Sequence, residues 1–85
     1  MSALIPAREI APTPTELDDR RAWAATAADD GELRAGALGV VQAAAPMLGR
    51  ALARGDASEA AYHLRTILTV CRVVDEIQTP ALVTA

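Results

Sequence analysis

Three motifs typical of helix starts divide this 85-residue sequence, and they constrain its fold more than any other feature. Each motif has Thr or Asp followed three residues later by Glu: Thr13 with Glu16, Asp29 with Glu32, and Asp56 with Glu59. In such a capping box the side chain of the first residue accepts a hydrogen bond from the backbone N–H of the Glu. The Glu side chain in turn accepts one from the backbone N–H of the first residue. After each motif the chain has a helical pattern, and the sequence predicts an all-α fold. The helices are expected at about 14–28, 32–54 and 57–78.

The composition favours the same fold class. Hydrophobic residues make up 52% of the chain, and 20 of them are Ala, the strongest helix former. Because Ala buries little area, the core depends on larger apolar residues, most of which follow Leu33. A single core is marginal at this size, and oligomerisation often adds stability. All eight basic residues are Arg, which with so much Ala indicates a GC-rich bacterial or phage genome.

The second predicted helix contains a proline, Pro46. Its apolar stripe keeps the same phase before and after this residue, so we expect one helix that is kinked at Pro46, with the proline away from the stripe. A break at Ala45 is the alternative. The stripe consists of Leu33, Ala37, Val40, Val41, Ala44, Leu48, Ala51 and Leu52.

The connection between the second and third helices is very short. Gly55 suits the left-handed position that ends a helix, and Asp56 starts the next one. So short a link predicts an antiparallel helical hairpin. The first helix is mostly polar and Ala, and we expect it to be weakly anchored to the hairpin.

The third helix is apolar over more of its circumference than one neighbour needs. At 100° per residue its polar strip, which includes Arg65, Arg72 and Glu76, is narrow, and an arc of about 240° is mainly apolar. Packing on one neighbour uses a stripe a little over 100° wide. We expect the hairpin partner to cover the side of Leu64 and Leu68, and the first helix to leave the other side bare.

An uncovered apolar patch of this kind marks an interface, and two hairpins that meet there make a four-helix bundle. We therefore predict a homodimer in a helical bundle. The predicted interface residues are Leu64, Ile67, Val70, Val73, Val74 and Ile77. The alternative is a three-helix monomer in which the first helix wraps the third.

Prolines and the chain ends define two tails. Residues 1–12 include Pro6 and Pro12 and are followed by Pro14, so they are expected to form an extended tail. This tail is either a disordered leader or a segment that docks its Leu and Ile side chains on a neighbouring subunit or partner. Residues 80–85 are expected to form a short C-terminal tail.

The residue inventory argues against several kinds of function. One Cys and one His exclude an ordinary zinc site, and His63 and Cys71 lie about 12 Å apart along one helix, too far to act together. We expect no catalytic residues, no metal site and no cofactor. The chain has a net charge of −3 and no strongly basic segment, so no nucleic acid partner is expected.

The location of the protein is predicted from the same sequence. The N-terminus lacks the basic start and apolar run of a signal peptide. The longest uncharged run, residues 35–49, is too short to span a bilayer. We expect a soluble cytoplasmic protein.

The leading functional hypothesis is a small non-enzymatic protein that acts by protein–protein interaction. It would be an adaptor, a regulator or a phage-encoded modulator, and it would self-associate. One alternative is a DNA-binding regulator of helix-turn-helix type, built around the short turn at Gly55. Another is a structural subunit of a larger assembly.

Overall fold

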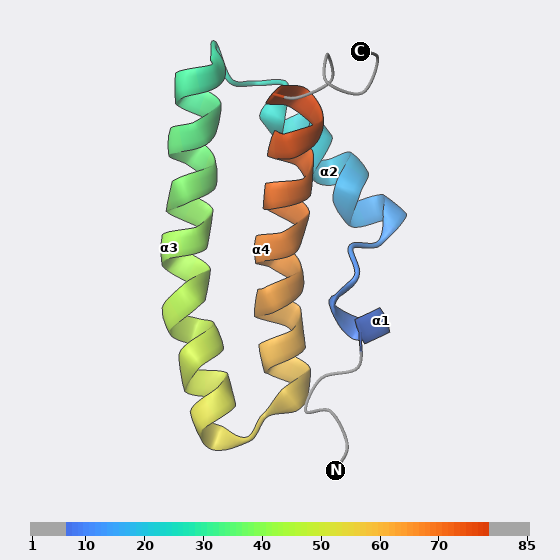
Figure 1. Cartoon of the computed structure of the whole chain (residues 1–85), viewed down its shortest axis with the longest axis vertical. Helices are drawn as coiled ribbons and strands as arrows, with labels where there is room; N and C mark the ends of the chain where they lie inside the picture. Colours follow the sequence, from blue (N-terminus) through green and yellow to red (C-terminus); the bar gives the residue numbers. More distant parts are fainter. Residues whose placement is uncertain (1–6, 79–85) are drawn as a thin grey trace.

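The computed structural model describes residues 7–78, and these residues are α-helical apart from short connections, with no strand among them (Figure 1). The helices are α1 (Ala7–Ile10), α2 (Pro14–Ala24), α3 (Asp30–Arg54) and α4 (Ala57–Gln78). The predicted all-α class is confirmed for this part of the chain. The expected tail at residues 80–85, and residues 1–6 of the N-terminal one, lie outside the described residues.

All three predicted cap residues accept the expected hydrogen bond, but only the first motif forms a full capping box. Thr13 and Glu16 make the full capping box: Thr13 Oγ1 accepts from the Glu16 N–H at 3.2 Å, and Glu16 Oε1 accepts from the Thr13 N–H at 3.0 Å. Asp29 and Asp56 accept from the N–H groups of Glu32 and Glu59, at 2.8 and 3.1 Å.

The helix that was expected to reach residue 28 ends earlier, at Ala24. The reason is a turn after Trp23, whose carbonyl accepts hydrogen bonds from both the N–H and the hydroxyl of Thr26. Glu32 then accepts from the Ala28 N–H at 3.1 Å, which holds the connection in place before α3. These local bonds replace the last turn of the predicted helix.

The two long helices, α3 and α4, lie side by side and run in opposite directions (Figure 1). Gly55 joins them with φ 73°, a left-handed conformation that glycine adopts without strain. The α3 helix is continuous through Pro46, which is exposed. The predicted stripe faces α4 over most of its length, because Leu33, Ala44 and Ala51 are buried.

The helices α1 and α2 pack against α4 (Figure 1). Within the predicted extended tail, residues 7–10 instead form the single helical turn α1. Prolines prevent a long helix here but allow one turn, and the Glu9 carbonyl at this turn accepts a hydrogen bond from Arg65 Nη1 at 2.8 Å. This tail segment therefore docks on its own chain.

The core lies where α2, α3 and α4 meet. Ala24, Leu33 and Val73 form its buried cluster, with Leu17, Trp23, Ala27 and Val74 packed around them. Trp23 lies so close to α3 that a Cβ atom added at Gly36 would be 3.0 Å from Cζ2 of the indole. A glycine at this position thus lets the ring of α2 approach the backbone of α3.

Candidate protein-binding face

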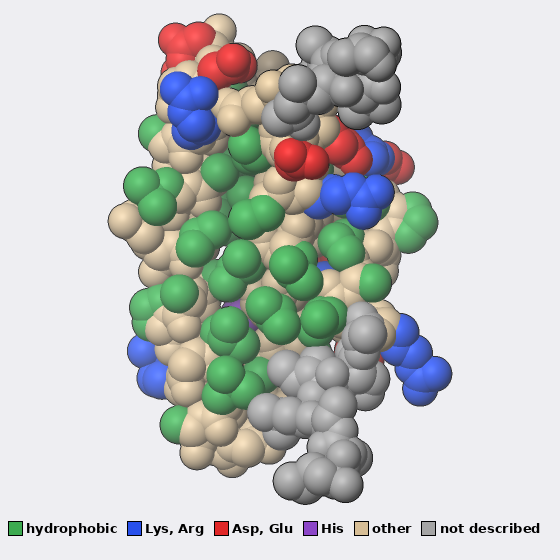
Figure 2. Space-filling view, viewed as in Figure 1, with side chains coloured by type: hydrophobic (Ala, Val, Ile, Leu, Met, Phe, Trp, Pro, Cys, Tyr) green, Lys and Arg blue, Asp and Glu red, His purple; other side chains and the backbone are tan. Residues whose placement is uncertain are grey.

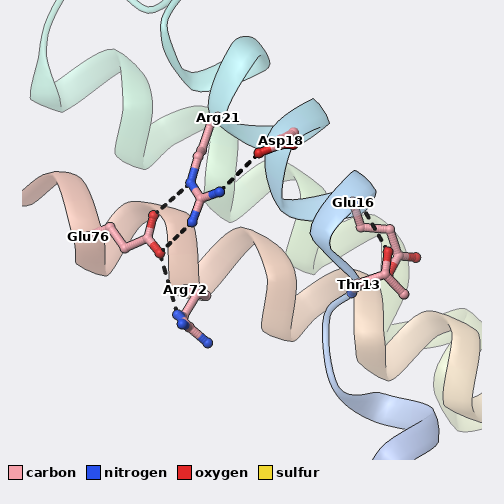
Figure 3. Close-up of polar contacts among 6 residues, drawn as sticks. All are labelled: Thr13, Glu16, Asp18, Arg21, Arg72 and Glu76. Carbon is pink, nitrogen blue, oxygen red and sulfur yellow. Dashed lines mark hydrogen bonds and ion pairs between the residues drawn. The ribbon is translucent and has the colours of Figure 1, made fainter.

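The polar strip of α4 is the side that holds the N-terminal segment. Arg21 of α2 donates from Nε and Nη2 to the two carboxylate oxygens of Glu76, at 3.0 and 2.9 Å (Figure 3). Asp18 and Arg72 extend this group, at 3.1 Å from Arg21 Nη1 and 3.5 Å from Glu76 Oε2. The hydrogen bonds from Arg21 lower the pKa of the Glu76 carboxyl, although partial desolvation opposes the shift.

A second ion pair holds the start of α2. Arg65 Nε donates to Glu16 Oε2 at 2.9 Å, while Nη1 of the same guanidinium bonds to α1. The pKa of Glu16 is lowered, first by the backbone N–H of Thr13 in the capping box and then by Arg65, against some desolvation. Arg65 therefore connects both N-terminal helices to α4.

The expectation that the first helix leaves the far side of α4 bare is wrong. Val70 and Val73 are 0% exposed, and Val73 packs in the cluster that includes Ala24 of α2. Both valines are fully buried within the chain, so both are core residues. The small apolar area of α2 predicts weak anchoring, but ion pairs position this helix on α4.

The other four predicted interface residues differ from one another in exposure and in their place around α4. Leu64, Ile67 and Val74 are half-buried, and Ile77 is 42% exposed. By helical phase Ile77 lies near Val73, well away from Leu64. The six residues therefore do not form one surface.

A different side of α4 is open. Leu68 is 37% exposed and Cys71 is exposed, and at 100° per residue they lie within about 60° of each other, with Leu64 between them. On α3, Leu38 and Leu52 are 56% and 42% exposed, and at 100° per residue both lie within about 40° of Arg34, which lines a hollow together with Cys71. Figure 2 shows hydrophobic side chains gathered over α3, α4 and the space between them.

We call this surface the α3–α4 face. Its residues are Leu38, Leu52, Leu64, Leu68, Cys71 and Val74. The sequence predicts that the hairpin partner covers Leu68, whereas this residue is 37% exposed. The available signal was the spacing of four and three residues from Leu64 to Leu68 to Cys71, which marks a separate seam on the helix.

Two shallow hollows meet on this face. One, of about 380 Å³, lies between α4 and the α1–α2 link and is lined by Ile10, Ala11, Pro12, Leu68, Cys71 and Arg72. The other, of about 300 Å³, lies between α3 and α4 and is lined by Arg34, Ala37, Cys71, Val74, Asp75 and Gln78. Cys71 borders both hollows, and Nε2 of Gln78 is buried without a hydrogen-bond partner among the described residues.

The groups with possible catalytic chemistry lie apart. His63 is buried with Nε2 3.8 Å from Glu59 Oε2, while Cys71 is on the open face. Within residues 7–78 no group of three or more His, Cys, Asp and Glu side chains is arranged to hold a metal ion.

A further hollow between α2 and α4, of about 330 Å³, contains Trp23 and Tyr62. Guanidinium groups of the chain itself already lie over both rings: Arg20 over Trp23 at 5.2 Å and Arg65 over Tyr62 at 5.9 Å. Each of these contacts lies within one helix, and the bond across the hollow is the one from Arg65 to Glu16.

Among the described helices, α3 alone is long and apolar enough to cross a membrane by length and composition. The uncharged run has only 15 residues, whereas the whole helix has 25. Only 11% of its most apolar window is buried within the chain. The apolar character of α3 thus lies largely on its surface.

Comparison of the chain with known protein families, with curated proteins and with solved structures finds no match. Function is therefore inferred from the geometry of the α3–α4 face.

Proposed function

We propose that this chain is a small non-enzymatic helical protein that acts by binding another protein surface through the α3–α4 face. The observation that carries the proposal is the exposure of Leu68 and Cys71 beside Leu38 and Leu52, across two adjacent helices. A contiguous apolar surface of this kind is typical of an interaction site. The protein would work without a cofactor, as a soluble cytoplasmic regulator or adaptor.

A protein partner explains this face better than nucleic acid does. DNA binding needs basic side chains directed at phosphates. Arg65 is instead bonded to Glu16 and to the Glu9 carbonyl, and Arg72 lies 3.5 Å from Glu76. The helix-turn-helix regulator is therefore the weaker proposal, and a DNA mobility shift that falls steeply with salt would revive it.

Affinity capture from an extract of the source organism tests the proposal. The wild type is compared with Leu68→Asp, which places a charge on the α3–α4 face. A matched control, Ala22→Asp, adds the same charge at an exposed position of α2. We expect the wild type and Ala22→Asp to retain the same partner and Leu68→Asp to lose it. Equal capture by all three proteins contradicts the assignment of the face.

A further inference from the structure

We infer that the partner of the α3–α4 face is a second copy of this chain, packed face to face as a layer of two helices on two. This inference rests on the proposed function and specifies its partner. It places the dimer contact on Leu64, Leu68 and Cys71, with Val70 and Val73 inside each copy.

The size of the face suits a two-helix partner. The 22 residues of α4 span about 33 Å, and two helices side by side present a strip about 20 Å wide. The projected area is therefore about 650 Å² per copy, near the roughly 800 Å² per partner of a standard stable interface. A single helix, about 10–12 Å across, would leave either the Leu68 side or the Leu38 side uncovered.

The shape of the face is self-complementary. Leu68 and Cys71 stand on α4 between two hollows, one toward α1 and one toward α3. In helical bundles the side chains of one helix insert into such hollows of the next layer. Two identical faces can exchange these contacts reciprocally, as an isologous interface requires.

The charge of the face also favours a second copy. The charged residues that line the two hollows are Arg34, Arg72 and Asp75, so each copy contributes a charge of only about +1. Two such faces repel each other little. An anionic membrane would be matched by a basic rim, but this chain has a net charge of −3 and an acidic residue at the hollow.

Cys71 gives the inference a geometric test. It borders both hollows, so it lies between the α1 side and the α3 side of the open surface. The centre of an isologous interface lies on its twofold axis and contacts itself. The Cys71 thiols of the two copies are therefore expected to lie next to each other.

Sedimentation equilibrium of the reduced protein over micromolar concentrations tests the dimer. We expect a dimer for the wild type, and for Leu68→Asp a dissociation constant at least about 100-fold higher, because each interface then buries two unpaired charges. Circular dichroism verifies that Leu68→Asp keeps its helicity. A wild type that stays monomeric at high micromolar concentration overturns the inference, as does a dimer that Leu68→Asp leaves intact.

Oxidation by copper phenanthroline tests whether Cys71 lies at the twofold axis of the dimer. Two Cys71 thiols lose two electrons to the oxidant and two protons to the solvent, which gives a disulfide-linked dimer. A control with the double change Cys71→Ser and Ser58→Cys moves the thiol to another exposed position on α4. We expect rapid cross-linking in the wild type only. Equal rates in both proteins overturn the twofold arrangement.

These outcomes also separate the inference from the proposed function. If the purified chain is monomeric but Leu68→Asp loses a captured protein, the face binds a different protein and the second copy is wrong. If the chain is monomeric and Leu68→Asp captures the same proteins as the wild type, both proposals fail.

Discussion

Arg21 and Glu76 lie 55 residues apart in the sequence and form a two-pronged ion pair, with N–O distances of 3.0 and 2.9 Å. Such fork-shaped pairing fixes direction as well as distance, because both guanidinium N–H groups must align with both carboxylate oxygens. The pair fixes the orientation of α2 on α4 beside the contact between Trp23 and Gly36. Val73 is covered as a result, and the open side of α4 is the one that carries Leu68.

Asp substitutions at Val73 and Leu68 are expected to have different effects. Val73→Asp buries a carboxylate in the core and should lower the free energy of unfolding by about 3–5 kcal/mol at any protein concentration. Leu68→Asp changes a partly exposed position, so the isolated chain should keep its helices. Urea unfolding followed by circular dichroism measures both. A stable Val73→Asp together with an unfolded Leu68→Asp would contradict the observed packing of α4.

Two glycines of α3 offer a matched comparison. Gly39→Ala adds a methyl group where no atom lies within 4 Å, and it should raise the free energy of unfolding by about 0.5–1 kcal/mol through helix propensity. Gly36→Ala has the same propensity gain, but its methyl group meets Trp23 at 3.0 Å. We expect Gly36→Ala to be less stable than Gly39→Ala and to shift the fluorescence of Trp23. Equal stabilities would show that α2 adjusts freely.

The free energy of unfolding should decrease at low pH, because carboxylates that hold α2 on α4 become protonated. Hydrogen bonds from Arg21 lower the pKa of Glu76 below its usual 4.5, so the folded state binds fewer protons than the unfolded state. This contribution is present above pH 4.5 and is lost as the pH falls toward the lowered folded-state pKa. Glu76→Gln should therefore flatten the decrease in stability below pH 4.5.

Asp19→Asn is the matched control for this titration, because it removes an acidic charge from α2 outside the ion pair with Glu76. Thermal unfolding between pH 3 and pH 7 makes the comparison. An identical pH profile for Glu76→Gln and the wild type would mean that the pair does not contribute to folding.

Pro46 should be replaceable. Pro46→Ala restores a backbone donor for the carbonyl four residues earlier, at Gln42, and removes a ring from an exposed position of a continuous helix. We expect unchanged or higher stability, with a gain of up to about 3 kcal/mol. Thermal unfolding measures the change. A loss of more than about 1–2 kcal/mol would show that the fixed φ of this proline is needed.

The helices were predictable because their signals are local. Thr13, Asp29 and Asp56 each cap a helix with a residue three positions away, and Gly55 ends α3 as its sequence position indicates. The stripe through Leu33 and Ala51 has the phase that packing against α4 requires.

The arrangement of α2 was not predictable in the same way. Its contacts with α4 join residues 49 and 55 positions apart, and no periodic pattern indicates that Glu16 pairs with Arg65 or Arg21 with Glu76. The polar strip of α4 binds α1 and α2 through these pairs. The sequence therefore predicts that the open side of α4 carries Val73, whereas in the structure the open side carries Leu68.

The order of residues along the chain gives the contact between Arg21 and Glu76 a consequence for protein synthesis. A ribosome that adds about 5–20 residues each second makes Glu76 roughly 3–11 s after Arg21. During that interval Leu17 and Trp23 have no α4 to pack against, since α4 is made after both of them. The nascent chain therefore exposes its N-terminal apolar side chains to chaperones until α4 is released.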